Sequence, residues 1–88
     1  MLDQPRKKIN QIDAKLVKLI EERYECVDEI VRIKTKNNLP TLDTSRESEV
    51  LSQLAALIEK EEYRDSILEI FQSIMDISKE YQYEKNRK

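Results

Sequence analysis

The sequence has 88 residues, of which 39% are charged, and its formal net charge is −2. This length predicts one domain over residues 1–88, and the charge balance offers no basic surface for nucleic acid. The chain contains neither histidine nor glycine. It therefore lacks the commonest general base and metal ligand, and it lacks the glycine-rich loops that cradle phosphates.

The expected location is the cytoplasm. No apolar run follows Met1, so the sequence predicts neither a signal peptide nor a membrane span. Cys26 is the single cysteine, which excludes an internal disulfide and a zinc site built from cysteines. The absence of glycine also removes the best residue for tight hairpin turns, so an all-α fold is expected.

Residues 3–36 have the apolar periodicity of one long helix. The stripe consists of Ile9, Ile12, Leu16, Leu19, Cys26, Ile30 and Ile33. Pro40 disfavours helix in the residue before it, so the helix should end near Asn37 and Asn38. A helix of this length measures about 50 Å, whereas a compact globule of 88 residues has a diameter of roughly 30 Å. The stripe would project from a monomer, and a second copy of the chain is the simplest way to bury it.

Two shorter helices are expected after this long one. Thr44 and Glu47 match a capping box, which predicts that the second helix starts at Thr44. Its apolar residues are Val50, Leu51, Leu54, Leu57 and Ile58. A break is expected at residues 61–64. A third helix is expected over residues 65–84, and its apolar stripe consists of Ile67, Phe71, Ile74 and Tyr81.

Three basic residues of the long helix could serve an anion. Arg23 lies within the apolar stripe, and Lys34 follows eleven residues later, rotated by about 20° and displaced by about 16 Å. Both could converge on one small anion, or Arg23 could pair with a glutamate while Lys34 ends the helix. Arg6 is about 25 Å from Arg23 and rotated by about 100°. It is therefore either a solvated residue or a contributor to a site on another chain.

The remaining polar candidates lie on the two shorter helices. Ser78 and Gln82 are neighbours at i and i+4, and a buried polar pair needs partners, either a ligand or another helix. Glu47 is explained by the capping box, Asp43 by a turn and Arg46 by an exposed helix surface. No one of these residues predicts a function by itself.

Taken together, they resemble the all-helical (type II) chorismate mutases over essentially the whole chain. The similar segments are residues 5–9, 12–13, 22–23, 33–34, 39–40, 43–47 and 71–82. The residues at the eight site positions of that family are Arg6, Arg23, Lys34, Asp43, Arg46, Glu47, Ser78 and Gln82. All eight match the family pattern in order and spacing.

The resemblance implies an interlocked homodimer of three-helix chains, in which Arg6 reaches the partner's site. It implies an isomerase that converts chorismate to prephenate, in phenylalanine and tyrosine biosynthesis, without metal or cofactor. All eight residues would bind the substrate. Arg6 and Arg23 would clamp it, while Lys34 and Gln82 would stabilise its breaking ether oxygen.

Three alternatives remain open at this point. An isochorismate-pyruvate lyase would use the same scaffold and the same carboxylate clamp. A regulatory domain detached from a fused aromatic-pathway enzyme would also retain the pattern. A helical dimerisation protein would explain the apolar stripes, although it would not explain eight polar residues in register with a known site.

Overall fold

The computed structural model describes residues 1–40 and 44–86, and every element in this part of the chain is helical. The elements are α1 (Asp3–Lys36), α2 (Thr44–Leu57), the short 3-10 helix η1 (Glu61–Tyr63) and α3 (Arg64–Asn86). This confirms the expected all-α fold with one long and two shorter helices. The break between the last two helices is wider than predicted, because α2 ends at Leu57.

The end of α1 shows how the chain terminates a helix without glycine. Asn38 has a positive φ of 55°, a conformation that asparagine tolerates better than most residues. The Leu39 amide donates to the Lys34 carbonyl at 2.8 Å, and the Asn38 amide donates to Thr35. This pattern is a Schellman motif, which satisfies the last carbonyls of the helix. The helix ends at the two asparagines, as the sequence predicts.

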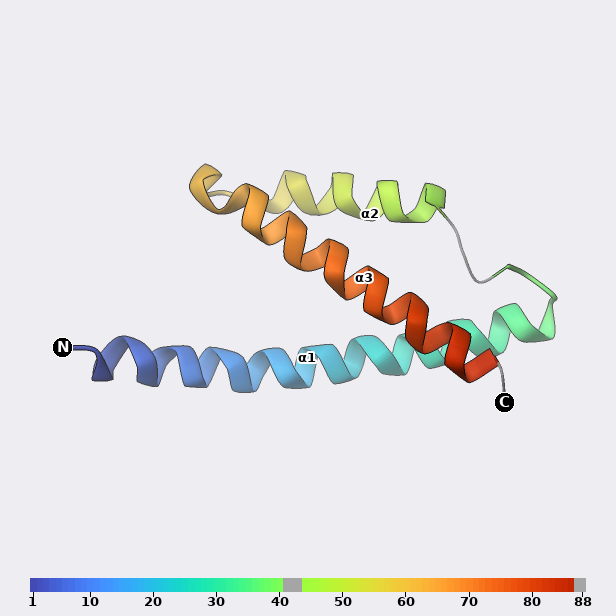
Figure 1. Ribbon diagram of the computed structural model, residues 1–88, viewed down its shortest axis with the longest axis horizontal. Coiled ribbons are helices and arrows are strands. Elements are labelled where there is room, and N and C mark those ends of the chain that lie inside the picture. Colours follow the sequence, from blue (N-terminus) through green and yellow to red (C-terminus); the bar gives the residue numbers. More distant parts are fainter. Residues whose placement is uncertain (41–43, 87–88) are drawn as a thin grey trace.

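Helix α3 holds the molecule together. It lies against α1 on one side and α2 on the other, whereas within the described residues the backbones of α1 and α2 do not come within 8 Å of each other, measured between Cα atoms. Figure 1 shows α3 running obliquely from the end of α2 down to the C-terminal half of α1. Two apolar side chains are buried at these contacts, Val27 of α1 and Met75 of α3.

A polar joint fixes the C-terminal end of α3 to α1. The Tyr81 hydroxyl donates to Asp28 at 2.6 Å, and the ring of Tyr81 packs edge-on against Tyr24 at a centroid distance of 5.0 Å. The Thr35 hydroxyl donates to the Asn86 side chain at 3.2 Å. These contacts set the rotation of α3 about its own axis, and with it the direction of every side chain on that helix.

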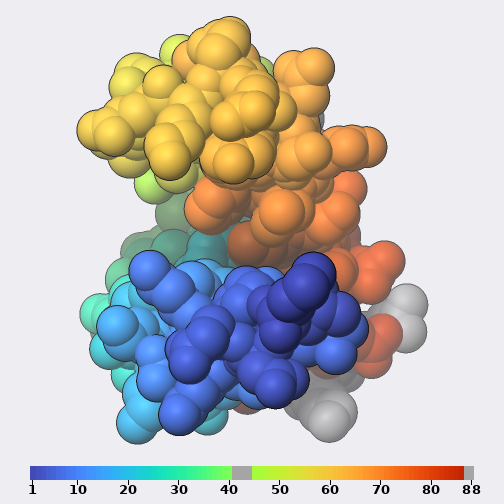
Figure 2. All heavy atoms as spheres, turned by 90° about the vertical axis from the view of Figure 1, so that its left-hand side faces the viewer, coloured from blue at the N-terminus to red at the C-terminus, as the bar shows by residue number. Residues whose placement is uncertain are grey.

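The N-terminal half of α1 has no cover in this structure. All residues up to Glu22 are exposed, and the apolar ones among them include Ile9, Ile12, Leu16, Val17, Leu19 and Ile20. The molecule measures 54 × 25 × 16 Å with a radius of gyration of 16.0 Å, against about 12 Å for a compact chain of this length. Viewed from the N-terminal end, the start of α1 and the α2–α3 connection form two lobes with a recess between them (Figure 2).

Candidate active site

A cleft of about 240 Å³ lies where the three helices converge. The apolar part of its lining includes Val27, Ile30, Val50 and Met75. Its walls contain six of the eight predicted site residues: Arg23, Lys34, Arg46, Glu47, Ser78 and Gln82. Two of these come from each helix, so the six side chains come together only when all three helices are packed correctly.

Arg23 and Ser78 form the centre of the cleft. The Arg23 guanidinium donates a hydrogen bond to the Ser78 hydroxyl oxygen at 2.8 Å, and Ser78 is only 4% exposed. The contact therefore gives the serine its partner on another helix. A guanidinium carries five N–H donors, so one bond to Ser78 leaves further donors with which Arg23 can bind an anion.

Gln82 lies one helical turn beyond Ser78 on the same face. Within the part of the chain that the structure describes, Gln82 Oε1 is buried without a hydrogen-bond partner. Buried polar atoms in this state are rare in native proteins. The terminal amide can turn by about 180° and present its NH₂ group at the same place. Gln82 thus offers a donor or an acceptor to a ligand, in a cleft that Lys34 also lines.

The first turns of α2 provide the other wall. The Arg46 guanidinium pairs with Glu49 at 2.9 Å, and the Arg46 side chain is 60% exposed, which places it at the rim. Glu47 is more enclosed, and its Oε1 lies 3.0 Å from the Lys79 ammonium of α3. Glu47 therefore joins α2 to α3 across the cleft.

Lys79 is a residue that sequence reasoning missed. It lines the cleft between Ser78 and Gln82, and its spacing of three residues from Gln82 was the signal that could have placed it there. Its hydrogen-bonding interaction with Glu47 raises the pKa of Lys79, as do the charges of Glu47 and Asp76, while burial opposes them. The ammonium consequently stays charged throughout the neutral range.

Two predicted site residues are not part of this cleft. Arg6 is an exposed residue in the first turns of α1 and does not line the cleft. Seventeen residues of helix separate it from Arg23, a distance of about 25 Å. Asp43 lies outside the described residues.

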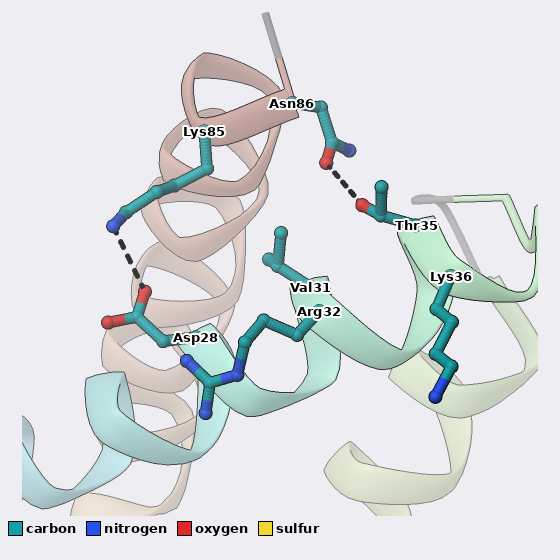
Figure 3. A pocket seen from close by; sticks show the side chains of 7 residues that line it. All are labelled: Asp28, Val31, Arg32, Thr35, Lys36, Lys85 and Asn86. Carbon is teal, nitrogen blue, oxygen red and sulfur yellow. Dashed lines mark hydrogen bonds and ion pairs between the residues drawn. The ribbon is translucent and has the colours of Figure 1, made fainter. Parts of the chain in front are cut away.

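A larger hollow, of about 410 Å³, lies between the C-terminal ends of α1 and α3 (Figure 3). It contains none of the predicted site residues. Its polar side chains include Asp28, which accepts from Tyr81 and lies 3.8 Å from the Lys85 ammonium, and the bonded pair of Thr35 and Asn86. This hollow belongs to the joint between α1 and α3. Among the described residues, no group of three or more potential metal ligands is found, and no helix is long and apolar enough to cross a membrane.

The family model of type II chorismate mutases matches residues 5–83, a span that includes every residue of the cleft. The chain belongs to this family. Isomerisation of chorismate to prephenate is therefore its activity, and the resemblance identified from the eight polar residues is confirmed.

The similar curated proteins carry the same activity in their names. A chorismate mutase of Methanocaldococcus jannaschii is 32% identical over 88% of this chain and 79% of its own length. A bifunctional chorismate mutase/prephenate dehydratase of Buchnera aphidicola from Acyrthosiphon pisum is 38% identical over 83% of the chain. The match spans only 19% of that longer protein. No solved structure shows significant similarity to the chain.

Proposed function

We propose that the chain, a single domain over residues 1–88, catalyses the rearrangement as an interlocked homodimer in the cytoplasm. Each of two sites would consist of the cleft of one chain and Arg6 of the partner subunit. The exposed apolar stripe of α1 supports this assembly, because a face with Ile9, Ile12 and Leu16 in water favours association. A two-fold axis would cover both stripes and supply both sites at once.

One observation carries the assignment of the site. Six polar residues that match the family pattern, drawn from three helices, line one cleft together with apolar side chains. The rearrangement transfers no proton and forms no covalent intermediate with the enzyme. A site built from arginine, lysine, serine and glutamine is therefore chemically sufficient.

The first contribution to catalysis is conformational. Chorismate is a dianion that must hold its enolpyruvyl arm over the ring before the new carbon–carbon bond can form. Arg23, oriented by Ser78, would bind one carboxylate, and Arg6 of the partner subunit would bind the other. Guanidinium groups suit this task because their planar donor pairs match a carboxylate. Fixing both ends selects the near-attack geometry, and Arg46 adds positive charge at the rim.

The second contribution is electrostatic. Negative charge develops on the ether oxygen as its bond to the ring breaks. Lys34 and Gln82 would donate to that oxygen, and such donors stabilise the transition state more than the ground state. The buried, unpartnered Oε1 of Gln82 supports this role, because the terminal amide can turn and present its NH₂ group at that place. Loss of one such donor typically costs about 2.7–4 kcal/mol, or 10²–10³ in rate. The carboxylate of Glu47 and the segment at Asp43 would hold the substrate hydroxyl.

The test is incubation of the purified protein with chorismate, following the loss of its ultraviolet absorbance and identifying the product. We expect prephenate in buffer alone, and a decrease of at least about 100-fold in Arg23→Ala. Arg32→Ala is the matched control, because Arg32 lies on the same helix but lines the other hollow. Pyruvate as the product would point to the lyase reaction, and no conversion by a folded protein would refute the assignment.

A further inference from the structure

Lys79 lies in the cleft although the family pattern does not include it. Its ammonium is 3.0 Å from Glu47 Oε1 and 3.6 Å from Asp76 Oδ1. The two acidic partners differ in environment. The Glu47 side chain is 22% exposed and lines the cleft, whereas the Asp76 side chain is 54% exposed and is not part of the lining. The enclosed contact joins the start of α2 to α3, so it fixes the position of Glu47 relative to Ser78 and Gln82.

The charges of the cleft explain what such a contact does. Among the described residues of the lining, Glu47 is the one carboxylate, and the cations are Arg23, Lys34, Arg46 and Lys79. A carboxylate repels both carboxylates of a dianionic substrate. The only donor that chorismate can offer it is the hydroxyl group of the ring. Glu47 must therefore be held where that hydroxyl lies, and its negative charge must be offset.

We propose that Lys79 is a positioning residue, which holds the Glu47 carboxylate in place to accept a hydrogen bond from the hydroxyl group of chorismate. This inference rests on the proposed function of the cleft. Lys79 acts through Glu47 and does not touch the substrate. Its positive charge lies beside the Glu47 carboxylate and offsets the repulsion between that carboxylate and a dianionic substrate.

The kinetic consequence follows from which bonds change in the reaction. The hydroxyl is not attached to a bond that forms or breaks, so its contact with Glu47 contributes similarly in the ground state and in the transition state. Loss of such uniform binding raises KM and leaves kcat nearly unchanged. We expect Lys79→Gln to raise KM about tenfold, since a hydrogen bond to a charged group is weakened rather than removed, with kcat within about twofold.

Two further variants separate positioning from other roles. Lys79→Arg should restore most of the affinity, because a guanidinium can also pair with the Glu47 carboxylate. Asp76→Asn is the matched control: it removes the other acidic partner of Lys79 and should leave KM and kcat unchanged. Circular dichroism of each variant establishes that the helices are retained.

The deciding experiment is a double-mutant cycle with Glu47→Gln, measured by the chorismate assay. If Lys79 acts through Glu47, Lys79→Gln should change KM by less than about twofold in the Glu47→Gln background. Independent, multiplying effects would overturn the proposal, because they would mean that Lys79 binds the substrate directly. An unchanged KM in Lys79→Gln would also overturn it. The wild-type measurement reports on the proposed function separately, since these results concern Lys79 only if the wild-type protein makes prephenate.

Discussion

The two halves of α1 carry the same apolar pattern but have different surroundings. From Arg23 to Lys36 the helix packs against α3, buries Val27, and contributes Arg23 and Lys34 to the cleft. From Asp3 to Glu22 the same face is exposed. The difference arises because α2 does not lie against α1 in the described part of the chain, and the 23-residue α3 is shorter than the 34-residue α1 and crosses it obliquely (Figure 1). A periodic stripe thus specifies which face is buried, but not which partner covers it.

The largest effect is expected from a charge in the exposed stripe. Leu16→Glu should leave the protein monomeric and reduce its activity at least about 100-fold, because an unpaired charge buried at an interface costs about 3–5 kcal/mol and a two-fold axis introduces it twice. Sedimentation velocity and the chorismate assay would measure both. Lys18→Glu is the control, since Lys18 lies about 200° further around the helix. A fully active Leu16→Glu protein of wild-type size would contradict a dimer interface at this stripe.

The second expected effect tests whether the two halves of α1 serve different sites. Arg6→Ala and Arg23→Ala should each be almost inactive as homodimers. Refolded together in equal amounts, they should recover about a quarter of the wild-type activity, because half the dimers are mixed and each mixed dimer has one intact site. Mass spectrometry of the native protein would establish that mixed dimers have formed. Mixed dimers without activity would contradict a site shared between chains.

The smallest effect is expected at the joint between the packed half of α1 and α3. Donation of a hydrogen bond to Asp28 raises the pKa of Tyr81; burial and the charge of Asp28 act in the same direction, and Lys85 opposes them. Tyr81→Phe should lower Tm by roughly 2–5 °C at pH 7. Tyr83→Phe, at an exposed position of the same helix, should have no effect.

The difference in Tm between the wild-type protein and Tyr81→Phe should depend on pH, because the pKa of Tyr81 is raised in the folded state. The folded state favours protonated Tyr81, so the stabilisation is complete below the unfolded pKa of about 10. It is lost as the pH rises through the higher folded value. Melting curves of the wild-type protein and Tyr81→Phe at one protein concentration, from pH 7 into the alkaline range, would measure this gap in Tm. A gap that widened with rising pH would contradict this assignment.

Much of the fold followed from local signals. Apolar spacing predicted the helices, and the asparagines before Pro40 marked the end of α1, where Asn38 now takes the positive φ. The boundary after α2 was less accurate, because the apolar spacing continues into Ile58 although the helix ends at Leu57. Near this boundary the Arg64 guanidinium donates a hydrogen bond to the Ala55 carbonyl at 3.0 Å. The apolar spacing does not predict this contact.

The candidate site was predictable only as a set. Arg23 and Ser78 each had an ordinary structural explanation, and their hydrogen bond joins residues 55 positions apart. Lys79 was overlooked because a lysine on a polar stretch of helix resembles a solvated residue. Its role became visible only when packing placed Glu47 of α2 beside it.

The sequence by itself determined the helices, their apolar faces and the family, because these depend on residue type and on spacing along the chain. Only the tertiary structure decided which side chains share the cleft, that Lys79 faces Glu47, and that the N-terminal half of α1 lies uncovered. The physical reason is that helix periodicity is a local property. The position of one helix against another depends instead on contacts such as Tyr81 with Asp28, which form between residues far apart in the chain.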